Sequence, residues 1–140
     1  DSQLGINRVQ EFLNKIEYGN QTTSSNLDLY WSDFSLKISP LEQVTLLKKF
    51  NTNEFHLNFQ NVFSVKNAIK IASTPNGNFY GKTGTGRVNG QDINGWFIGY
   101  VETSDNSYYF ATNIQSNSNA TGKKAFEITS DILKKLHIWN

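Results

Sequence analysis

The strand-forming part of the chain reads "FYGKTGTGRVNGQDINGWFIGYVETSDNSYYFATNI" over residues 79–114. Three apolar or glycine-containing runs, residues 79–86, 93–103 and 107–114, are separated by short polar turns. Short turns of Gly, Asn, Asp and Ser join neighbouring antiparallel strands as hairpins. The middle run is apolar on both of its alternating faces, which predicts a central strand covered on both sides. We therefore predict an antiparallel sheet of these three strands.

The rest of the chain contains four segments with helical spacing. Apolar residues recur three or four positions apart in residues 5–16, 39–50, 59–72 and 123–136. In the second segment Ser39 can cap the helix, Pro40 suits its first position, and Glu42 can complete a capping box. The predicted order is three helices, three strands and a helix. That order indicates an α+β fold, an α/β/α sandwich with helices on both faces of the sheet.

The tripeptide Gly81-Lys82-Thr83 also occurs in loops that bind nucleotide phosphates. Such a loop requires a glycine at position 76 and a helix directly after the threonine. Position 76 is Asn76, and a turn at residues 88–92 follows the motif. The motif is therefore interpreted as part of a strand.

In a strand, Lys82 and Gly84 point to one face while Thr83 and Thr85 point to the other. The glycines remove bulk, so another group can approach the backbone closely. A free backbone N–H on such a strand can stabilise an oxyanion. A glycine-rich edge strand without a chemical role is the alternative that these residues alone leave open.

Composition excludes several functional classes. The 140 residues carry a formal net charge of +1, with no cysteine and no methionine. A strongly basic face is expected for nucleic-acid binding, so no nucleic-acid partner is predicted. Without cysteine there are no disulfides or thiolate metal sites. His56 and His137 are far apart in sequence, so no metal site is predicted.

Other motifs accompany Lys-Thr-Gly, which on a strand is typical of penicillin-recognising serine enzymes. "YGN" occupies residues 18–20, Trp31 follows within an irregular polar loop, and "SLKISPLEQ" occupies residues 35–43. This order resembles the class D β-lactamases. Residues 81–112 most resemble the extracellular penicillin-sensor domain of bacterial β-lactam-sensing signal transducers, in particular the methicillin-resistance type. The resemblance covers essentially the whole chain.

The resemblance implies roles for the residues of the strand motif. Lys82 would support proton transfer around the nucleophile. The side chains of Thr83 and Thr85 would hold the carboxylate of the antibiotic, with Gly84 between them in the substrate-binding segment. The backbone N–H of Thr85 would form one half of the oxyanion hole.

The resemblance also implies two residues near the active-site lysine that activates the serine. Asn20 would lie beside this lysine, and Trp31 would pack over it. The lysine would carry a carbamate formed from carbon dioxide, and no other cofactor is implied. Taken without the resemblance, Trp31 is a core aromatic residue.

The nucleophile motif of the resembled family, Ser-x-x-Lys, is absent from this sequence. The second family motif, Ser-x-Val or Ser-x-Asn, is also missing before the first helix. We therefore expect residues 1–140 to be a single partial domain, the C-terminal portion of the penicillin-recognising fold. We expect it to pack against the N-terminal portion that carries Ser-x-x-Lys.

Three functions remain in competition. A sensor would be acylated by β-lactams and would signal across the membrane from its extracellular face, as part of an integral membrane protein. A class D β-lactamase would use the same acylation and then hydrolyse the ester. No arginine follows Asn113 to hold the substrate carboxylate, which favours the sensor. A binding module is the third option, with a stacking surface formed by Trp96, Tyr100, Tyr108 and Tyr109.

Overall fold

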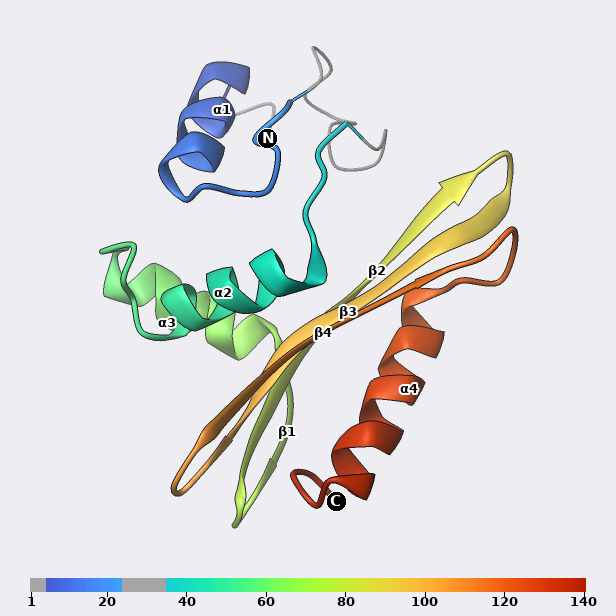
Figure 1. Ribbon diagram of the computed structural model, residues 1–140. Coiled ribbons are helices and arrows are strands. Elements are labelled where there is room, and N and C mark those ends of the chain that lie inside the picture. Colours follow the sequence, from blue (N-terminus) through green and yellow to red (C-terminus); the bar gives the residue numbers. More distant parts are fainter. Residues whose placement is uncertain (1–4, 24–34) are drawn as a thin grey trace.

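The computed structural model describes residues 5–23 and 35–140. Its elements in chain order are α1 (Ile6–Lys15), α2 (Pro40–Asn51), α3 (Phe59–Ala68), β1 (Lys70–Thr74), β2 (Gly77–Val88), β3 (Gln91–Thr103), β4 (Ser107–Gln115) and α4 (Gly122–Lys135). The strands form one antiparallel sheet in the order β1-β2-β3-β4 (Figure 1). The predicted α+β class is confirmed.

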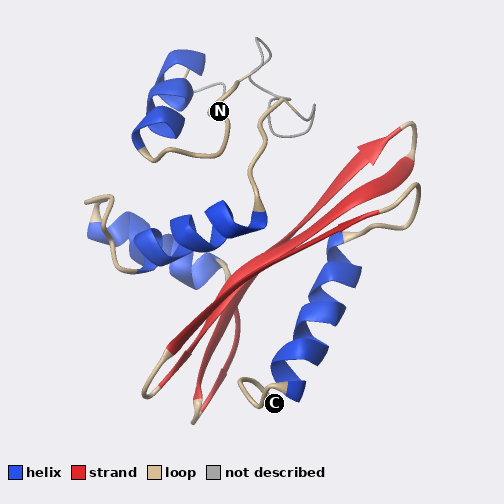
Figure 2. Ribbon diagram, in the orientation of Figure 1, coloured by secondary structure: helices blue, strands red, loops and turns tan. Residues whose placement is uncertain are grey.

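The sheet is covered differently on its two faces. Helix α4 lies along one face, called here the α4 face, and contacts β2, β3 and β4. Helix α2 lies against β3 and β4 on the opposite face, the α2 face, as Figure 2 shows. The arrangement is the predicted α/β/α sandwich.

The core lies between the sheet and α4. Phe79 of β2 pairs with Val101 of β3, and Phe97 lies on the same face of β3, four residues before Val101. These three side chains are buried together with Ala125 and Leu133 of α4. The rings of Phe79 and Phe97 meet edge to face at 6.1 Å, a favoured geometry for aromatic pairs.

The capping signals predicted before α2 are all present. The Ser39 hydroxyl accepts a hydrogen bond from the Glu42 N–H at 3.2 Å, and the Glu42 carboxylate accepts one from the Ser39 N–H at 2.8 Å. These bonds lower the pKa of Glu42. Because the box fixes where α2 begins, it also fixes Gln43 in the first turns, close to the site described below.

The predicted helix over residues 59–72 is confirmed over residues 59–68 and is wrong over its last four residues. Helix α3 ends at Ala68, and Lys70–Thr74 form the edge strand β1. Lys70 pairs with Tyr80, and the Gly81 N–H donates to the Ile69 carbonyl at 2.8 Å. Apolar spacing of three and four suited a helix here, but pairing with β2 outweighs that local preference.

Phe97→Ala is expected to lower the free energy of unfolding by about 3–5 kcal/mol, because it leaves a cavity in the core. Phe97 is 1% exposed, whereas Phe63 of α3 is 54% exposed. Phe63→Ala is therefore the matched control, with an expected loss below about 1 kcal/mol. Urea unfolding followed by tryptophan fluorescence measures both, and equal losses would contradict the assigned core.

Candidate functional site

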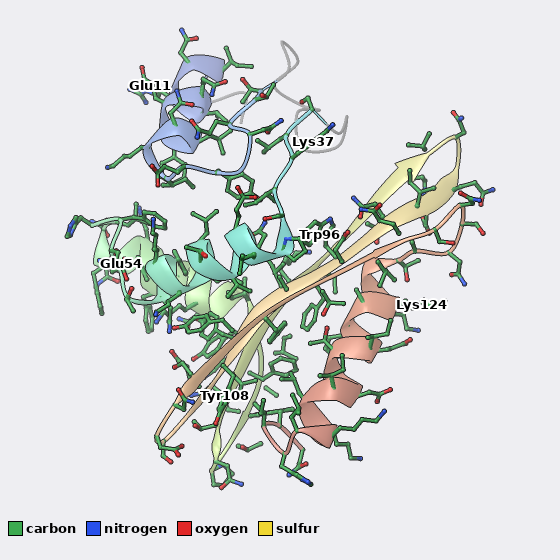
Figure 3. The ribbon with its side chains drawn as sticks, in the orientation of Figure 1. Glu11, Lys37, Glu54, Trp96, Tyr108 and Lys124 are labelled. Atoms are coloured by element: carbon green, nitrogen blue, oxygen red, sulfur yellow. The ribbon has the colours of Figure 1, made fainter. Side chains whose placement is uncertain are left out.

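An open cavity of about 760 Å³ lies on the α2 face, beside the second half of β2. Its walls come from β2, β3, the end of β4, the residues just before α2, and Tyr18. Four of the residues predicted for the site, Lys82, Thr83, Gly84 and Thr85, line it together. Figure 3 places Trp96 and Lys37 on this side of the sheet and Lys124 on the opposite side.

The edge of β2 facing away from β3 is open along this cavity. β1 pairs with β2 only over Gly77–Tyr80, and the last link is the hydrogen bond from Gly81 N–H to Ile69. No strand in the described ranges pairs with that edge beyond Gly81. Backbone groups of a strand alternate in direction, so Thr83 and Thr85 direct their N–H to the same open edge as Gly81. The Thr85 N–H is therefore a backbone donor without a strand partner among residues 5–23 and 35–140.

Lys82 brings a cation to the open edge. Its side chain leaves β2 on the α2 face and is exposed. The Nζ atom donates a hydrogen bond to the Thr83 carbonyl at 2.6 Å. An ammonium group in this position attracts an anion placed beside the strand.

The two threonine side chains lie on the α4 face. The Thr85 hydroxyl accepts a hydrogen bond from the Gly122 N–H, the first residue of α4, at 2.9 Å. The Thr83 side chain is exposed, and among the described residues no hydrogen bond engages its hydroxyl. Thr83 is thus free to bind a ligand at the strand edge, while Thr85 already has a structural partner.

Asn20 forms hydrogen bonds to the backbone that precedes α2. Its N–H donates to the Lys37 carbonyl at 2.9 Å, and its Oδ1 accepts the Lys37 N–H at 2.9 Å. Its Nδ2 donates to the Ser35 carbonyl at 2.8 Å. Both ends of the amide therefore join residues 18–20 to residues 35–37, at the rim of the cavity. Its predicted place beside a catalytic lysine stays a prediction.

Gly19 allows this close approach. It has a φ of 51°, and a Cβ atom there would lie 1.9 Å from the Lys37 carbonyl oxygen. Neither the conformation nor the space suits any other residue. Trp31, the remaining predicted site residue, lies outside the described residues.

Tyr18 and Gln43 line the cavity, although the motifs YGN and SLKISPLEQ that contain them predicted no role for either residue. Gln43 is buried in the first turns of α2, and its Nε2 donates to the Tyr18 hydroxyl at 2.7 Å. Burial raises the pKa of Tyr18, and the bond from Gln43 opposes the rise. Nothing in the local sequence marks Gln43 as buried, so only the tertiary structure identifies the pair.

Next to the cavity, tyrosines of β2, β3 and β4 form a polar cluster on the α2 face. The rings of Tyr80 and Tyr100 stack with their centroids 4.6 Å apart, and the centroids of the Tyr100 and Tyr109 rings are 5.7 Å apart. Asn51 of α2 donates to the Tyr109 hydroxyl and to Glu102. Tyr100 is fully buried. It is thus unable to serve in the stacking surface considered for nucleic acid or sugar.

Residues 1–134 match the model of the penicillin binding protein transpeptidase domain. The chain belongs to this family. Over 138 residues it is 44% identical to the methicillin resistance mecR1 protein of Staphylococcus aureus, and over 139 residues 46% identical to the regulatory protein BlaR1 of Bacillus licheniformis. Each alignment covers 99% of this chain and 23% of the relative.

Solved structures of transpeptidase-family proteins share the fold. The C-terminal domain of the Bacillus licheniformis BlaR penicillin-receptor superposes with a TM-score of 0.94 at 45% identity, covering 100% of this chain and 56% of that one. A class D β-lactamase from Bacillus subtilis superposes with a TM-score of 0.90 at 36% identity, covering 99% of this chain and 56% of that one. The resemblance to sensor domains and class D β-lactamases is confirmed, and the chain spans about half the length of these solved structures.

Each helix within residues 5–23 and 35–140 is too short or too polar to span a membrane. No group of three His, Asp or Glu side chains in that part of the chain could hold a metal ion.

Gly19→Ala is expected to destabilise the protein by about 1–3 kcal/mol more than Gly90→Ala. Both glycines have positive φ, but a Cβ at Gly90 meets nothing within 4 Å, whereas at Gly19 it meets the Lys37 carbonyl. Urea unfolding measures the loss of stability in each variant, and the difference between the two losses gives the cost of the contact with the Lys37 carbonyl. Equal losses would show that Lys37 is not held against Gly19.

The tyrosine cluster predicts a loss of stability in alkali. Burial is the main cause that raises the pKa of Tyr100 above its ordinary value of 10.0. Above about pH 10 the unfolded chain releases this proton more readily, so the free energy of unfolding falls with rising pH. Tyr100→Phe should reduce that slope by about 1.4 kcal/mol per pH unit between about pH 10 and 12. An unchanged slope in urea unfolding would contradict the burial of this hydroxyl in its neutral form.

Proposed function

We propose that this chain is the C-terminal part of a β-lactam sensor domain, acylated by penicillins at a serine outside this sequence. The observation that carries the proposal is the open edge of β2, where a free backbone donor at Thr85 stands beside the ammonium of Lys82. The similarity to a penicillin-receptor domain at a TM-score of 0.94 supports it. The acylated state would signal across the membrane and induce resistance genes.

In the proposed reaction the serine hydroxyl attacks the carbonyl carbon of the β-lactam ring. The new C–O bond forms as the ring C–N bond breaks, and the ring nitrogen takes up a proton. The Thr85 N–H would donate to the carbonyl oxygen as it gains negative charge. Lys82 would support the proton transfer around the serine, and the hydroxyl of Thr83 would hold the carboxylate of the antibiotic.

The remaining part of the domain is the proposed partner of this chain. It would carry Ser-x-x-Lys, with the lysine carbamylated as the general base that activates the serine. The chain covers only 56% of the solved penicillin-receptor domain. Exposed apolar side chains on α4 and at the residue that ends it are consistent with further packing, namely Ile128, Ile132 and Leu136. Asn20 and Trp31 are proposed to lie near the carbamylated lysine.

The proposed location is the extracellular face of the bacterial cell membrane, where β-lactams arrive from outside. The membrane-embedded remainder of the receptor would be the second partner. The share of 23% that the chain covers in the regulatory relatives leaves room for such a remainder.

A class D β-lactamase is the alternative function. Its structures superpose closely, and the proposed acylation is the same. Regulatory relatives are 38–46% identical to the chain, against 32–38% for the β-lactamases. The absence of an arginine after Asn113 also favours the sensor. The two functions differ in the barrier to deacylation, by about 1.4 kcal/mol for each tenfold in rate.

The intact domain is expected to gain the mass of benzylpenicillin within minutes and to keep it for hours. Intact-mass spectrometry over time measures the adduct, with the serine of Ser-x-x-Lys changed to alanine as the control. An adduct that disappears while the drug is consumed would instead identify a β-lactamase. No adduct on the unmodified domain would contradict both.

A further inference from the structure

We propose that Thr85 and Gly122 are positioning residues for acylation, because their hydrogen bond holds the Thr85 N–H in place on the open edge of β2. This inference rests on the proposed function, in which that N–H stabilises the oxyanion. It assigns the Thr85 hydroxyl to the fold rather than to the carboxylate of the antibiotic.

The first residue of α4 lies directly against the backbone of the motif strand. A Cβ atom on Gly122 would lie 2.6 Å from the Gly84 carbonyl oxygen, 2.9 Å from the Gly84 nitrogen and 2.9 Å from the Thr83 Cβ. Backbone atoms cannot move aside as the end of a flexible side chain can. Only glycine therefore allows α4 to approach β2 this closely.

The neighbouring strand is held against the same helix start. A Cβ atom on Gly95 of β3, the residue paired with Thr85, would lie 2.4 Å from the Thr121 carbonyl oxygen. The Ala120 N–H donates to the Asp92 carbonyl at 2.8 Å. The segment entering α4 is thus fixed to β3 before it reaches β2, so it offers a rigid reference for the position of Thr85.

The Gly122 N–H lies in the first turn of α4. An N–H group in the first turn has no carbonyl acceptor within its own helix. The helix cap, Thr121, satisfies a different one, the N–H of Lys124. The Thr85 hydroxyl accepts the Gly122 N–H at 2.9 Å. Loss of that acceptor would leave a helix donor unpaired and would release Thr85 from α4.

Because this edge of β2 is open, the hydrogen bond from Gly122 to Thr85 would affect the rate of acylation. Beyond Gly81 no described strand holds β2 from its outer side, and glycines at 84 and 86 leave the backbone without side-chain packing. Thr83, on the same face, has no hydrogen bond of this kind within the described ranges. An oxyanion donor must lie about 2.7–3.1 Å from the oxygen it stabilises, and a displacement of about 1 Å can cost 100-fold in rate.

The test uses the intact domain with Thr85→Val, which keeps the shape but removes the acceptor, and Thr85→Ser, which keeps the hydroxyl. Stopped-flow measurement with benzylpenicillin separates the acylation rate constant from the dissociation constant of the initial complex. We expect Thr85→Val to slow acylation about tenfold or more, with the dissociation constant changed by less than about threefold. Thr85→Ser should restore a rate close to that of the unmodified domain.

Thr112→Val is the matched control. Thr112 of β4 shares a hydrogen bond of 2.7 Å with Thr129 of α4, so it is another strand-to-α4 hydroxyl contact, away from the cavity. Its loss should lower the melting temperature without changing the acylation rate. The infrared band of the acyl-ester carbonyl gives an independent readout. Thr85→Val should move this band to higher wavenumber, because the ester loses hydrogen bonding, and Thr112→Val should not.

Gly122→Ala provides a second variant if Thr85→Val does not fold, since it keeps the hydroxyl and pushes α4 away from Gly84. It should also slow acylation and move the carbonyl band. Unchanged acylation in folded Thr85→Val or Gly122→Ala would overturn the inference. A weaker initial complex with an unchanged acylation rate would also overturn it, because the hydroxyl would then bind the antibiotic directly. An unmodified domain that forms no adduct would contradict the proposed function instead.

Discussion

The pairing of β2 is unequal on its two sides, and the site depends on this inequality. β3 pairs with β2 from Gly77 to Val88, whereas β1 pairs only with Gly77–Tyr80. The ladder with β3 follows β2 along its whole length, with one register shift between Gly86 and Arg87. The short ladder on the other side leaves the backbone donors of Thr83 and Thr85 without strand partners in the described part of the chain. An unpaired edge is normally an aggregation hazard, and here it is the feature that a ligand with a carbonyl and a carboxylate would use.

Close backbone contacts, rather than long side chains, hold the elements around this edge. Gly19 brings residues 18–20 against Lys37, and Gly122 brings α4 against β2. In both places a methyl group would overlap with backbone atoms. The two glycines act on opposite sides of the sheet, so the cavity is bounded by the Tyr18 segment on the α2 face and the motif strand is supported by α4 from behind. The Lys82 side chain and the cavity therefore lie on the α2 face, and the contact with Gly122 lies on the α4 face.

The transpeptidase family relationship agrees with a site that is incomplete within this chain. Its described residues supply a cation, a free hydroxyl and a backbone donor, but the sequence has no Ser-x-x-Lys nucleophile. Regulatory relatives and β-lactamases both match this part of the fold. In both proposed functions the wall formed by β2 would serve acylation, and the rate of any later hydrolysis would depend on groups outside this wall.

Local sequence was sufficient for the features that local forces control. Helical spacing located α1, α2 and α4, the capping box before α2 is present as predicted, and alternation assigned Phe97 and Trp96 to opposite faces. Long-range pairing decided the rest. Residues 70–72, predicted as the end of a helix, belong instead to β1 because they lie beside β2 in the sheet. The hydrogen bond between Asn20 and Lys37 joins residues that are 17 positions apart, and the one between Thr85 and Gly122 joins residues that are 37 positions apart. Such contacts exist only after the chain has folded, so no local pattern records them.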